Sequence, residues 1–167
     1  WMPARDRSTG ELAIAVATKF FAVGARVPYI AAGVGAIATQ ALVNPFYGLD
    51  GLKLLREGQS PQEAVACLTS ADAGRDHRQL HIIDAAGRIA QHTGSACVDW
   101  CGHLQGDGFS IAGNMLAGPQ VIEATAETYT RVSALPFPRR LIAAMRAGEA
   151  AGGDKRGKQS AVRVIHG

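Results

Sequence analysis

The sequence predicts a mixed α+β fold with helices on both sides of two stacked, mostly antiparallel sheets. One observation is the order of the segments, which reads strands, two helices, strands, two helices, strand. That order differs from the strict strand and helix alternation of a parallel doubly wound sheet. A second observation is that several strand segments are apolar on both faces, as expected for sheets that are covered on both sides.

The first two predicted strands cover residues 11–18 and 33–39. The first alternates large and small apolar residues behind the turn signal Ser8-Thr9-Gly10, and the second repeats this pattern. Glycine and alanine on one face of such strands allow another layer to approach closely, although they weaken the strand itself. Both strands are therefore expected to be buried.

Two helices and a hairpin follow. Leucines at helical spacing predict a helix over residues 47–58, and Ser60, Pro61 and Glu63 supply an N-cap, a first-turn proline and a capping-box acid for the next helix. Residues 78–84 and 88–93 flank Ala85-Ala86-Gly87, a pattern that is typical of a hairpin with glycine at the bend.

The last third of the chain completes the order. An apolar strand is predicted over residues 109–116, and amphipathic helices over residues 120–132 and 139–150, separated by the break Pro136-Phe-Pro138. Residues 159–165 have the pattern of a final strand. No internal repeat interrupts this order.

Length and composition indicate one packed domain, which we take to span residues 1–167. Apolar residues make up 47% of the chain and charged residues 19%, proportions that exclude a disordered or fibrous protein. The net charge of +3 comes from 17 basic and 14 acidic residues that are scattered along the chain. Without basic stripes or stacking aromatic residues, we expect no nucleic-acid partner.

Membrane insertion and secretion are not expected either. The longest uncharged run, residues 27–49, is interrupted by Pro28, Gln40 and Asn44, so it is not expected to span a bilayer. Three cysteines, an odd number, behind no cationic and apolar leader indicate no secreted disulfide framework. We therefore expect a cytoplasmic protein.

Three glycine motifs imitate nucleotide or nucleophile sites without their context. Gly152 to Lys158 has phosphate-loop spacing, but Gln159 stands where a Ser or Thr belongs and a strand follows in place of a helix. Gly33-Val-Gly35 lies inside an apolar strand pattern with no helix after it. Gly108-Phe-Ser110 lacks the second glycine of a nucleophile elbow. We expect no cofactor.

A cluster of soft ligands leaves a zinc site open as an alternative. His92, Cys97, Cys101 and His103 lie within twelve residues, and thiolate and imidazole together suit zinc. The spacing is not that of a standard finger, so the main interpretation assigns no metal. Cys97 and His103 are also considered as a nucleophile and base pair.

Two residues at predicted strand ends are candidates for catalysis. Asn114 follows an apolar strand, where a side-chain amide can donate to a developing oxyanion; its other interpretation is a turn residue. Lys19 ends the first strand beside Phe20 and Phe21, a setting that can lower the pKa of a lysine by desolvation; its other interpretation is a surface lysine.

Short motifs spread along the chain carry a family resemblance. They occur in this order: Ala4-Arg-Asp6, Thr9-Gly-Glu-Leu12, Ala15-Val-Ala17, Gly33-Val-Gly-Ala36, Ala38-Thr-Gln40, Asn44-Pro45, Arg78-Gln-Leu80, His92-Thr-Gly94, Cys97, Gly102-His103, Gly106-Asp-Gly108, Gly113-Asn114, Leu116-Ala-Gly118, Gly152-Gly-Asp154, Arg156-Gly157 and Gln159-Ser-Ala161. Together they resemble the bacterial and archaeal family known as domain of unknown function 1028 (DUF1028), grouped with the N-terminal-nucleophile (Ntn) hydrolase-like proteins. The resemblance covers residues 4–164.

The resemblance implies a four-layer αββα sandwich and a possible mechanism. In Ntn hydrolases the first residue of the mature chain, a Thr, Ser or Cys, attacks an amide carbonyl while its α-amine acts as the base. Members of the DUF1028 family typically begin with Met-Thr before an aromatic residue, a serine and two aliphatic residues that lead into Ala-Arg-Asp. Here Trp1-Met2-Pro3 stand in place of that serine and those aliphatics. We expect the nucleophile to precede Trp1 and both ends of the chain to be incomplete.

The leading hypothesis is thus an Ntn-type amide hydrolase acting on a small-molecule or peptide amide. Lys19 would be a basic neighbour of the nucleophile and Asn114 the oxyanion donor. The residues expected to shape the substrate pocket are Gln40, His103, Asp154, Arg156, Gln159 and Ser160. The alternative is a binding or assembly protein that keeps the sandwich without the chemistry, and in either case exposed sheet edges lead us to expect a homo-oligomer.

Overall fold

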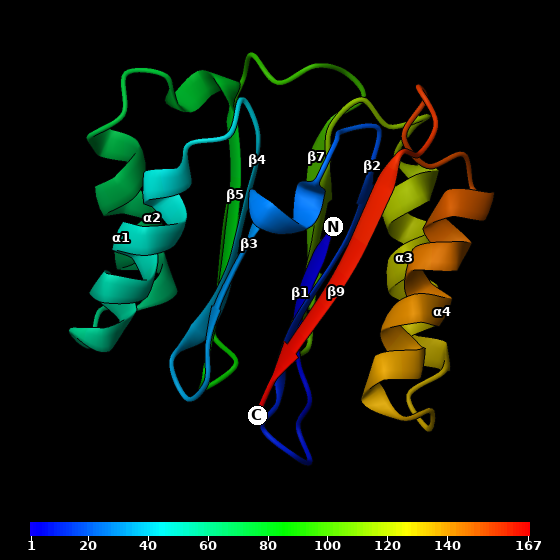
Figure 1. Ribbon diagram of the computed structural model, residues 1–167, viewed down its shortest axis with the longest axis horizontal. Helices are drawn as coiled ribbons and strands as arrows, with labels where there is room; N and C mark the ends of the chain where they lie inside the picture. The colour runs from blue at the N-terminus through cyan, green and yellow to red at the C-terminus, as the bar shows by residue number, and fades with distance from the viewer.

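The computed structural model describes residues 1–167 and has the four-layer arrangement that the sequence predicts (Figure 1). One sheet has the strand order β7-β8-β1-β2-β9 and the other the order β3-β4-β5-β6. The strands are β1 (Met2–Arg5), β2 (Leu12–Thr18), β3 (Pro28–Ala31), β4 (Gly35–Ala41), β5 (Arg78–Asp84), β6 (Ile89–Thr93), β7 (Gly102–Gly106), β8 (Phe109–Gly113) and β9 (Ser160–His166). Neighbouring strands within each sheet are antiparallel.

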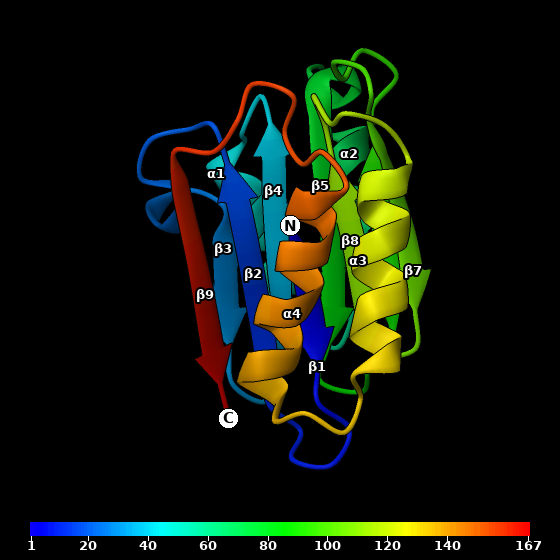
Figure 2. The same cartoon turned by 90° about the vertical axis from the view of Figure 1, so that its right-hand side faces the viewer.

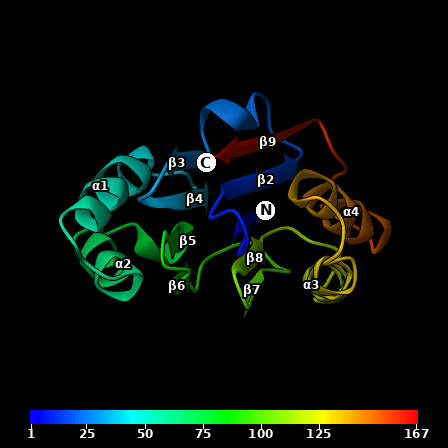
Figure 3. The same cartoon turned by 90° about the horizontal axis from the view of Figure 1, so that it is seen from below.

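Helices form the outer layers. The pair α1 (Pro45–Arg56) and α2 (Pro61–Ser70) covers the β3-β4-β5-β6 sheet, and the pair α3 (Gln120–Arg131) and α4 (Phe137–Ala150) covers the other sheet (Figures 2 and 3). Two single-turn 3-10 helices, η1 (Val23–Ala25) and η2 (Arg75–His77), lie in the connections. None of the helices combines the length and the apolar character that crossing a bilayer requires.

The start of α2 forms as its sequence predicts, whereas α1 begins at Pro45, two residues before the predicted start. The side chain of Asn44 caps α1 by accepting a hydrogen bond from the backbone N–H of Phe46 at 3.1 Å. Ser60 and Glu63 make the predicted capping box at the start of α2. Each cap satisfies backbone N–H groups that have no partner inside the helix.

Three apolar layers fill the spaces between the four layers of structure. Leu12, Ile14 and Val16 of β2 point into the space between the sheets, whereas Ala13 and Ala15 point toward α3 and α4. The third layer packs α1 and α2 on the outer face of β4 and β5. A sheet covered on both faces needs apolar residues at successive positions, which explains the uninterrupted apolar runs of the sequence.

Three strands escape prediction because their sequences are short and contain poor strand formers. Strands β1 and β3 have four residues each, with Pro3 inside β1 and Pro28 at the start of β3. Strand β7 begins and ends with glycine. Proline and glycine are both disfavoured in strands, so only the neighbouring strands hold these segments in place.

Strand β4 and helix α1 are each displaced by two residues from their predicted ranges, and two further boundaries differ for local reasons. Strand β8 ends at Gly113 and not at residue 116, because Met115 adopts a positive φ of 54° that is incompatible with a strand. Helix α4 begins at Phe137, two residues before the predicted start, and Pro138 lies in its first turn, where a missing N–H breaks no helical hydrogen bond. Two of the three residues of the predicted break, Phe137 and Pro138, therefore belong to the helix.

Candidate functional site

A cavity of about 400 Å³ opens where several strands end at one edge of the sandwich. We call it the strand-end cavity. It is lined by the following residues: Thr18, Phe20, Val23, Arg26, Val27, Gln40, Ala41, Leu42, Val43, His77, Ala96, Cys97, Val98, Asn114, Met115 and Arg156. Its volume lies within the range of small-molecule sites, and its lining of apolar walls with a few polar groups is typical of them.

Polar side chains enter this cavity from the ends of three buried strands. Thr18 is the last residue of β2, Gln40 is the next to last of β4, and Asn114 follows β8 directly. Thr18 and Asn114 are 3% and 8% exposed. Buried polar groups need partners, yet the Oε1 atom of Gln40 is buried without a hydrogen-bond partner. The wall of the cavity therefore contains an acceptor that has no partner within the protein.

Asn114 is held in place by a second buried amide, that of Gln79 in β5. The Nδ2 atom of Asn114 donates to Oε1 of Gln79 at 3.2 Å. The Nε2 atom of Gln79 in turn donates to the carbonyl oxygen of Gly113 at 2.9 Å and to Oγ1 of Thr93 at 3.0 Å. A side-chain amide carries two N–H groups, so one N–H of Asn114 is left to bind a ligand from a fixed position.

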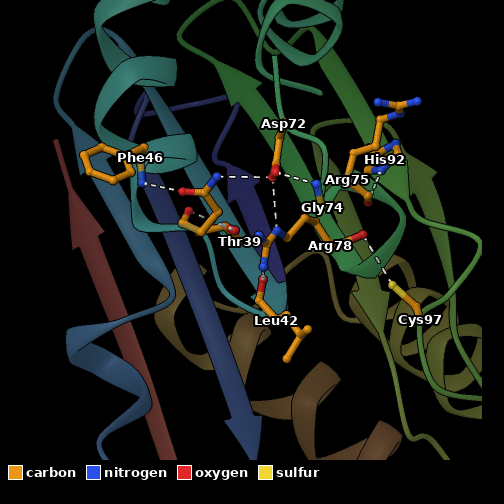
Figure 4. Close-up of polar contacts among 10 residues, drawn as sticks. Thr39, Leu42, Phe46, Asp72, Gly74, Arg75, Arg78, His92 and Cys97 are labelled. Atoms are coloured by element: carbon orange, nitrogen blue, oxygen red, sulfur yellow. Dashed lines mark hydrogen bonds and ion pairs between the residues drawn. The ribbon is translucent and has the colours of Figure 1, made fainter. Parts of the chain in front are cut away.

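One wall of the cavity is supported by a charged network on its outer side (Figure 4). Arg78 donates to Oδ2 of Asp72 at 3.1 Å and to the carbonyl oxygen of Leu42 at 2.5 Å. Cys97 Sγ donates to the carbonyl oxygen of Arg78 at 3.3 Å. Because Leu42 and Cys97 both line the cavity, the pair Asp72 and Arg78 fixes the spacing of this wall.

The carboxylate of Asp72 is the fixed charge of that network. Burial raises its pKa, but hydrogen bonds from Arg78 and the backbone N–H of Gly74 outweigh burial and hold the pKa well below its ordinary value. The ion pair with Arg78 therefore persists at mildly acidic pH.

The loop before β9 closes the opposite side. Arg156 lines the cavity and pairs with Asp154 through two contacts, Nε to Oδ1 at 2.9 Å and Nη2 to Oδ2 at 2.6 Å. The backbone N–H of Lys19 also donates to Asp154, at 3.2 Å. Burial raises the pKa of Asp154, but these hydrogen bonds outweigh it and lower the pKa below its ordinary value. Asp154 thus joins the end of β2 to Arg156.

Strand β1 lies between β2 and β8, and its first residues are on the side of this edge. Met2 pairs with Ala15 of β2, and Ala4 pairs with Phe109 of β8. At its start, the backbone of Trp1 exchanges two hydrogen bonds with Ala112, both at 3.1 Å.

Comparisons with known proteins identify the family. A family model described as "Family of unknown function (DUF1028)" matches residues 2–167. The chain belongs to the DUF1028 family. The crystal structure of protein SPO2555 from Silicibacter pomeroyi, also a DUF1028 protein, matches with a TM-score of 0.93 and 37% sequence identity, over 99% of this chain and 71% of that chain. No curated protein matches the chain. The predicted resemblance to the DUF1028 family is thus confirmed.

In this DUF1028 chain the residues predicted from sequence divide into three groups. Asn114, Gln40 and Arg156 come together in the strand-end cavity, with Asp154 bound to Arg156. Around the end of β2 lie Lys19, Gln159 and Ser160, whose side chains do not line the cavity; Gln159 donates its backbone N–H to Thr18, and Ser160 donates to the carbonyl oxygen of Phe20. His103 is exposed on β7 and bonds to Oγ1 of Thr93 at 2.8 Å, on the far side of Gln79.

The alternative sites of the sequence have other roles in the DUF1028 chain. Cys97 and His103 each bond to a different partner, Arg78 and Thr93, and Cys101 Sγ contacts the carbonyl oxygen of Cys97 at 3.6 Å. Burial raises the pKa of the Cys97 thiol, which disfavours the thiolate. No three His, Cys, Asp or Glu side chains gather closely enough to hold a metal ion.

The structure also reveals contributors that sequence reasoning did not select, namely Thr18, Arg26 and Gln79. Gln79 is completely buried near the start of β5, a strand that also contains the polar residues Arg78, His81 and Asp84, so no sequence signal singled it out. Thr18 was a polar strand end like Asn114. Arg26 lies in an irregular segment after η1, and its sequence context carried no comparable signal.

Proposed function

We propose that this DUF1028 protein is an amide hydrolase of the N-terminal-nucleophile kind and that its reaction takes place at the mouth of the strand-end cavity. The proposal depends on one observation, the direction and register of β1. Both neighbours of β1 deliver a cavity residue, Thr18 on one side and Asn114 on the other, at the same level, two residues before Trp1.

The register of the two strand pairs identifies this position. Met2 pairs with Ala15, so a position two residues before Trp1 would stand opposite Thr18. Ala4 pairs with Phe109, so the same position would stand opposite Asn114 on the other side. Side chains two residues apart share a face of a strand, and Trp1 points between the sheets. A side chain at that position would therefore point toward the cavity.

The family resemblance assigns a threonine to that position. In the proposed reaction the threonine hydroxyl oxygen bonds to the amide carbonyl carbon, and its proton passes to the free α-amine of the same residue. The carbonyl oxygen takes up negative charge, which the free N–H of Asn114 stabilises. The C–N bond then breaks, the amine leaves with the proton, and water hydrolyses the ester to release the acid and restore the hydroxyl.

Lys19 enters the proposal as a basic neighbour and not as a wall of the cavity. It follows Thr18 at the end of β2, and its side chain is exposed. A protonated lysine near the nucleophile would favour the neutral form of the α-amine, which is the form that accepts a proton. Lys19 is thus expected to influence the pH profile more than the position of the substrate.

The test uses the protein isolated from its own host. Mass spectrometry of the intact chain should show a Thr, Ser or Cys at the N-terminus two positions before Trp1, and screening with a panel of amides should show hydrolysis that is lost when this residue is replaced by Ala. An active enzyme whose chain starts at Trp1 would refute the nucleophile. Hydrolysis that survives the Ala replacement would do the same, and binding without hydrolysis would favour the binding-protein alternative.

A further inference from the structure

The charges around the strand-end cavity are unbalanced. Two arginines, Arg26 and Arg156, line it together with His77, and no aspartate or glutamate does. Arg156 is neutralised by its two contacts with Asp154. Arg26 makes no ion pair, and its guanidinium lies 5.7 Å from the centroid of the Phe20 ring. A cation–π contact orients an arginine and leaves its N–H groups free for an anion.

Apolar side chains line the same cavity as the unpaired Arg26. Val23, Val27 and Met115 line the interior, while Phe20, Leu42 and Val98 stand at the mouth with 46%, 61% and 48% of their surfaces exposed. Large apolar side chains exposed together around a cavity indicate a surface that binds an apolar group. A ligand that fits these walls therefore combines an apolar part with one negative charge.

The interior also presents a donor and an acceptor at neighbouring positions. Gln40 pairs with Gln79 across β4 and β5, and residues that pair directly share a face of the sheet. Gln79 holds Asn114, so the unpartnered Oε1 of Gln40 and the free N–H of Asn114 belong to the same cluster. An acceptor beside a donor matches the N–H and the C=O of a secondary amide.

We propose that the strand-end cavity binds N-acyl amino acids: a secondary amide with an apolar acyl group and a free carboxylate. Arg26 binds the carboxylate, Gln40 accepts from the amide N–H, Asn114 donates to the amide carbonyl, and the apolar walls hold the acyl chain. This assignment rests on the proposed function for its site and deepens it by naming the substrate class. It concerns binding, so it can be tested separately from hydrolysis.

Calorimetry provides the test, on the full-length protein in which the residue two positions before Trp1 is replaced by Ala so that turnover does not mask binding. The probes are N-octanoylglycine, its neutral counterpart N-octanoylglycinamide, and octanoyloxyacetate, in which an ester oxygen replaces the amide N–H. We expect the first to bind at least tenfold more tightly than either of the others. Equal affinities for all three, or no binding of N-octanoylglycine at millimolar concentration, would overturn the proposal.

Two matched variants assign the roles. Arg26→Gln should weaken N-octanoylglycine about tenfold and leave N-octanoylglycinamide unchanged, whereas Arg56→Gln, at the exposed end of α1, should change neither. Gln40→Leu should reduce the preference for the amide over the ester.

An Arg26→Gln protein that is folded by circular dichroism and binds N-octanoylglycine normally would refute the carboxylate site. Failure to find amide hydrolysis would refute the proposed function and leave this binding result standing.

Discussion

Two polar clusters lie between the same two sheets and differ in access. At the edge, Gln79 and Asn114 face the strand-end cavity. In the interior, Nδ1 of His81 lies 2.7 Å from Oγ of Ser110, and both residues are completely buried. The interior pair has the composition of a serine and base site, yet it lines none of the larger cavities described for the molecule. Residue chemistry alone therefore does not distinguish the two clusters, whereas access to a cavity does.

The environment of His81 supports a structural role. Burial holds its pKa well below the ordinary value of 6.5. Trp1 packs edge-on against its ring with centroids 4.8 Å apart, and the Nε2 atom has no partner. Ser110 also accepts a hydrogen bond from Gln91 at 2.6 Å. Thus His81 is a neutral packing residue, while Asn114 keeps a free donor at a cavity.

The largest expected effect separates the two clusters by activity. In the hydrolytically active protein, Asn114→Ala should lower kcat about 100- to 1000-fold, the usual loss for one oxyanion donor, whereas Ser110→Ala should leave kcat within about twofold. Steady-state kinetics on both variants checks this. Equal losses in the two variants, or a larger loss for Ser110→Ala, would reverse the assignment of the two clusters.

The next effect compares the two glutamines that hold the clusters. Gln79→Leu should lower the free energy of unfolding by about 3 kcal/mol, because the buried carbonyl of Gly113 and the amide of Asn114 lose their partner. Binding of N-octanoylglycine should weaken as well. Gln91→Leu is the matched control, since it should lower stability without affecting binding. Denaturant unfolding and calorimetry give both quantities, and unchanged binding in Gln79→Leu would show that Asn114 needs no anchor.

A smaller effect is the pH dependence that His81 contributes to stability. Its pKa is lower in the folded chain than in the unfolded chain, so below about pH 6.5 the unfolded state binds a proton that the folded state does not. Stability should therefore fall as pH decreases from about 6.5, by at most about 1.4 kcal/mol per pH unit. Urea unfolding of wild type and His81→Leu between pH 5 and 8 should give curves that diverge at low pH. Parallel curves would mean that His81 can be protonated in the folded state.

The smallest effect concerns the outer wall of the cavity. Arg78→Lys keeps the charge but loses the forked geometry that joins Asp72 to the carbonyl of Leu42. We expect a loss of about 1 kcal/mol in stability and a severalfold weaker binding of N-octanoylglycine. A lysine at the equivalent place in the exposed pair of Arg7 and Asp107 should have no measurable effect on either quantity. Unchanged binding in Arg78→Lys would show that the wall does not depend on this network.

Sequence patterns predicted the architecture well because strands β2, β4, β5 and β8 are buried on both faces. In addition, every helix has a recognisable start or an amphipathic pattern. They missed β1, β3 and β7, whose places are fixed by neighbouring strands and not by their own residues. In the site, they selected Asn114, Gln40 and Arg156 but could not show that the side chain of Lys19 faces solvent. Position along a strand is visible in a sequence, whereas the direction of a side chain at the strand end depends on the loop that follows.

The proposal that the terminal residue is the nucleophile can be tested directly by locating the reactive residue with a strained acyl electrophile. The protein from its own host is treated with a β-lactone, digested, and the acylated residue is identified by mass spectrometry. We expect acylation of the terminal residue two positions before Trp1, and slower acylation in Asn114→Ala. Acylation of Ser110, with the terminal residue unmodified, would contradict it.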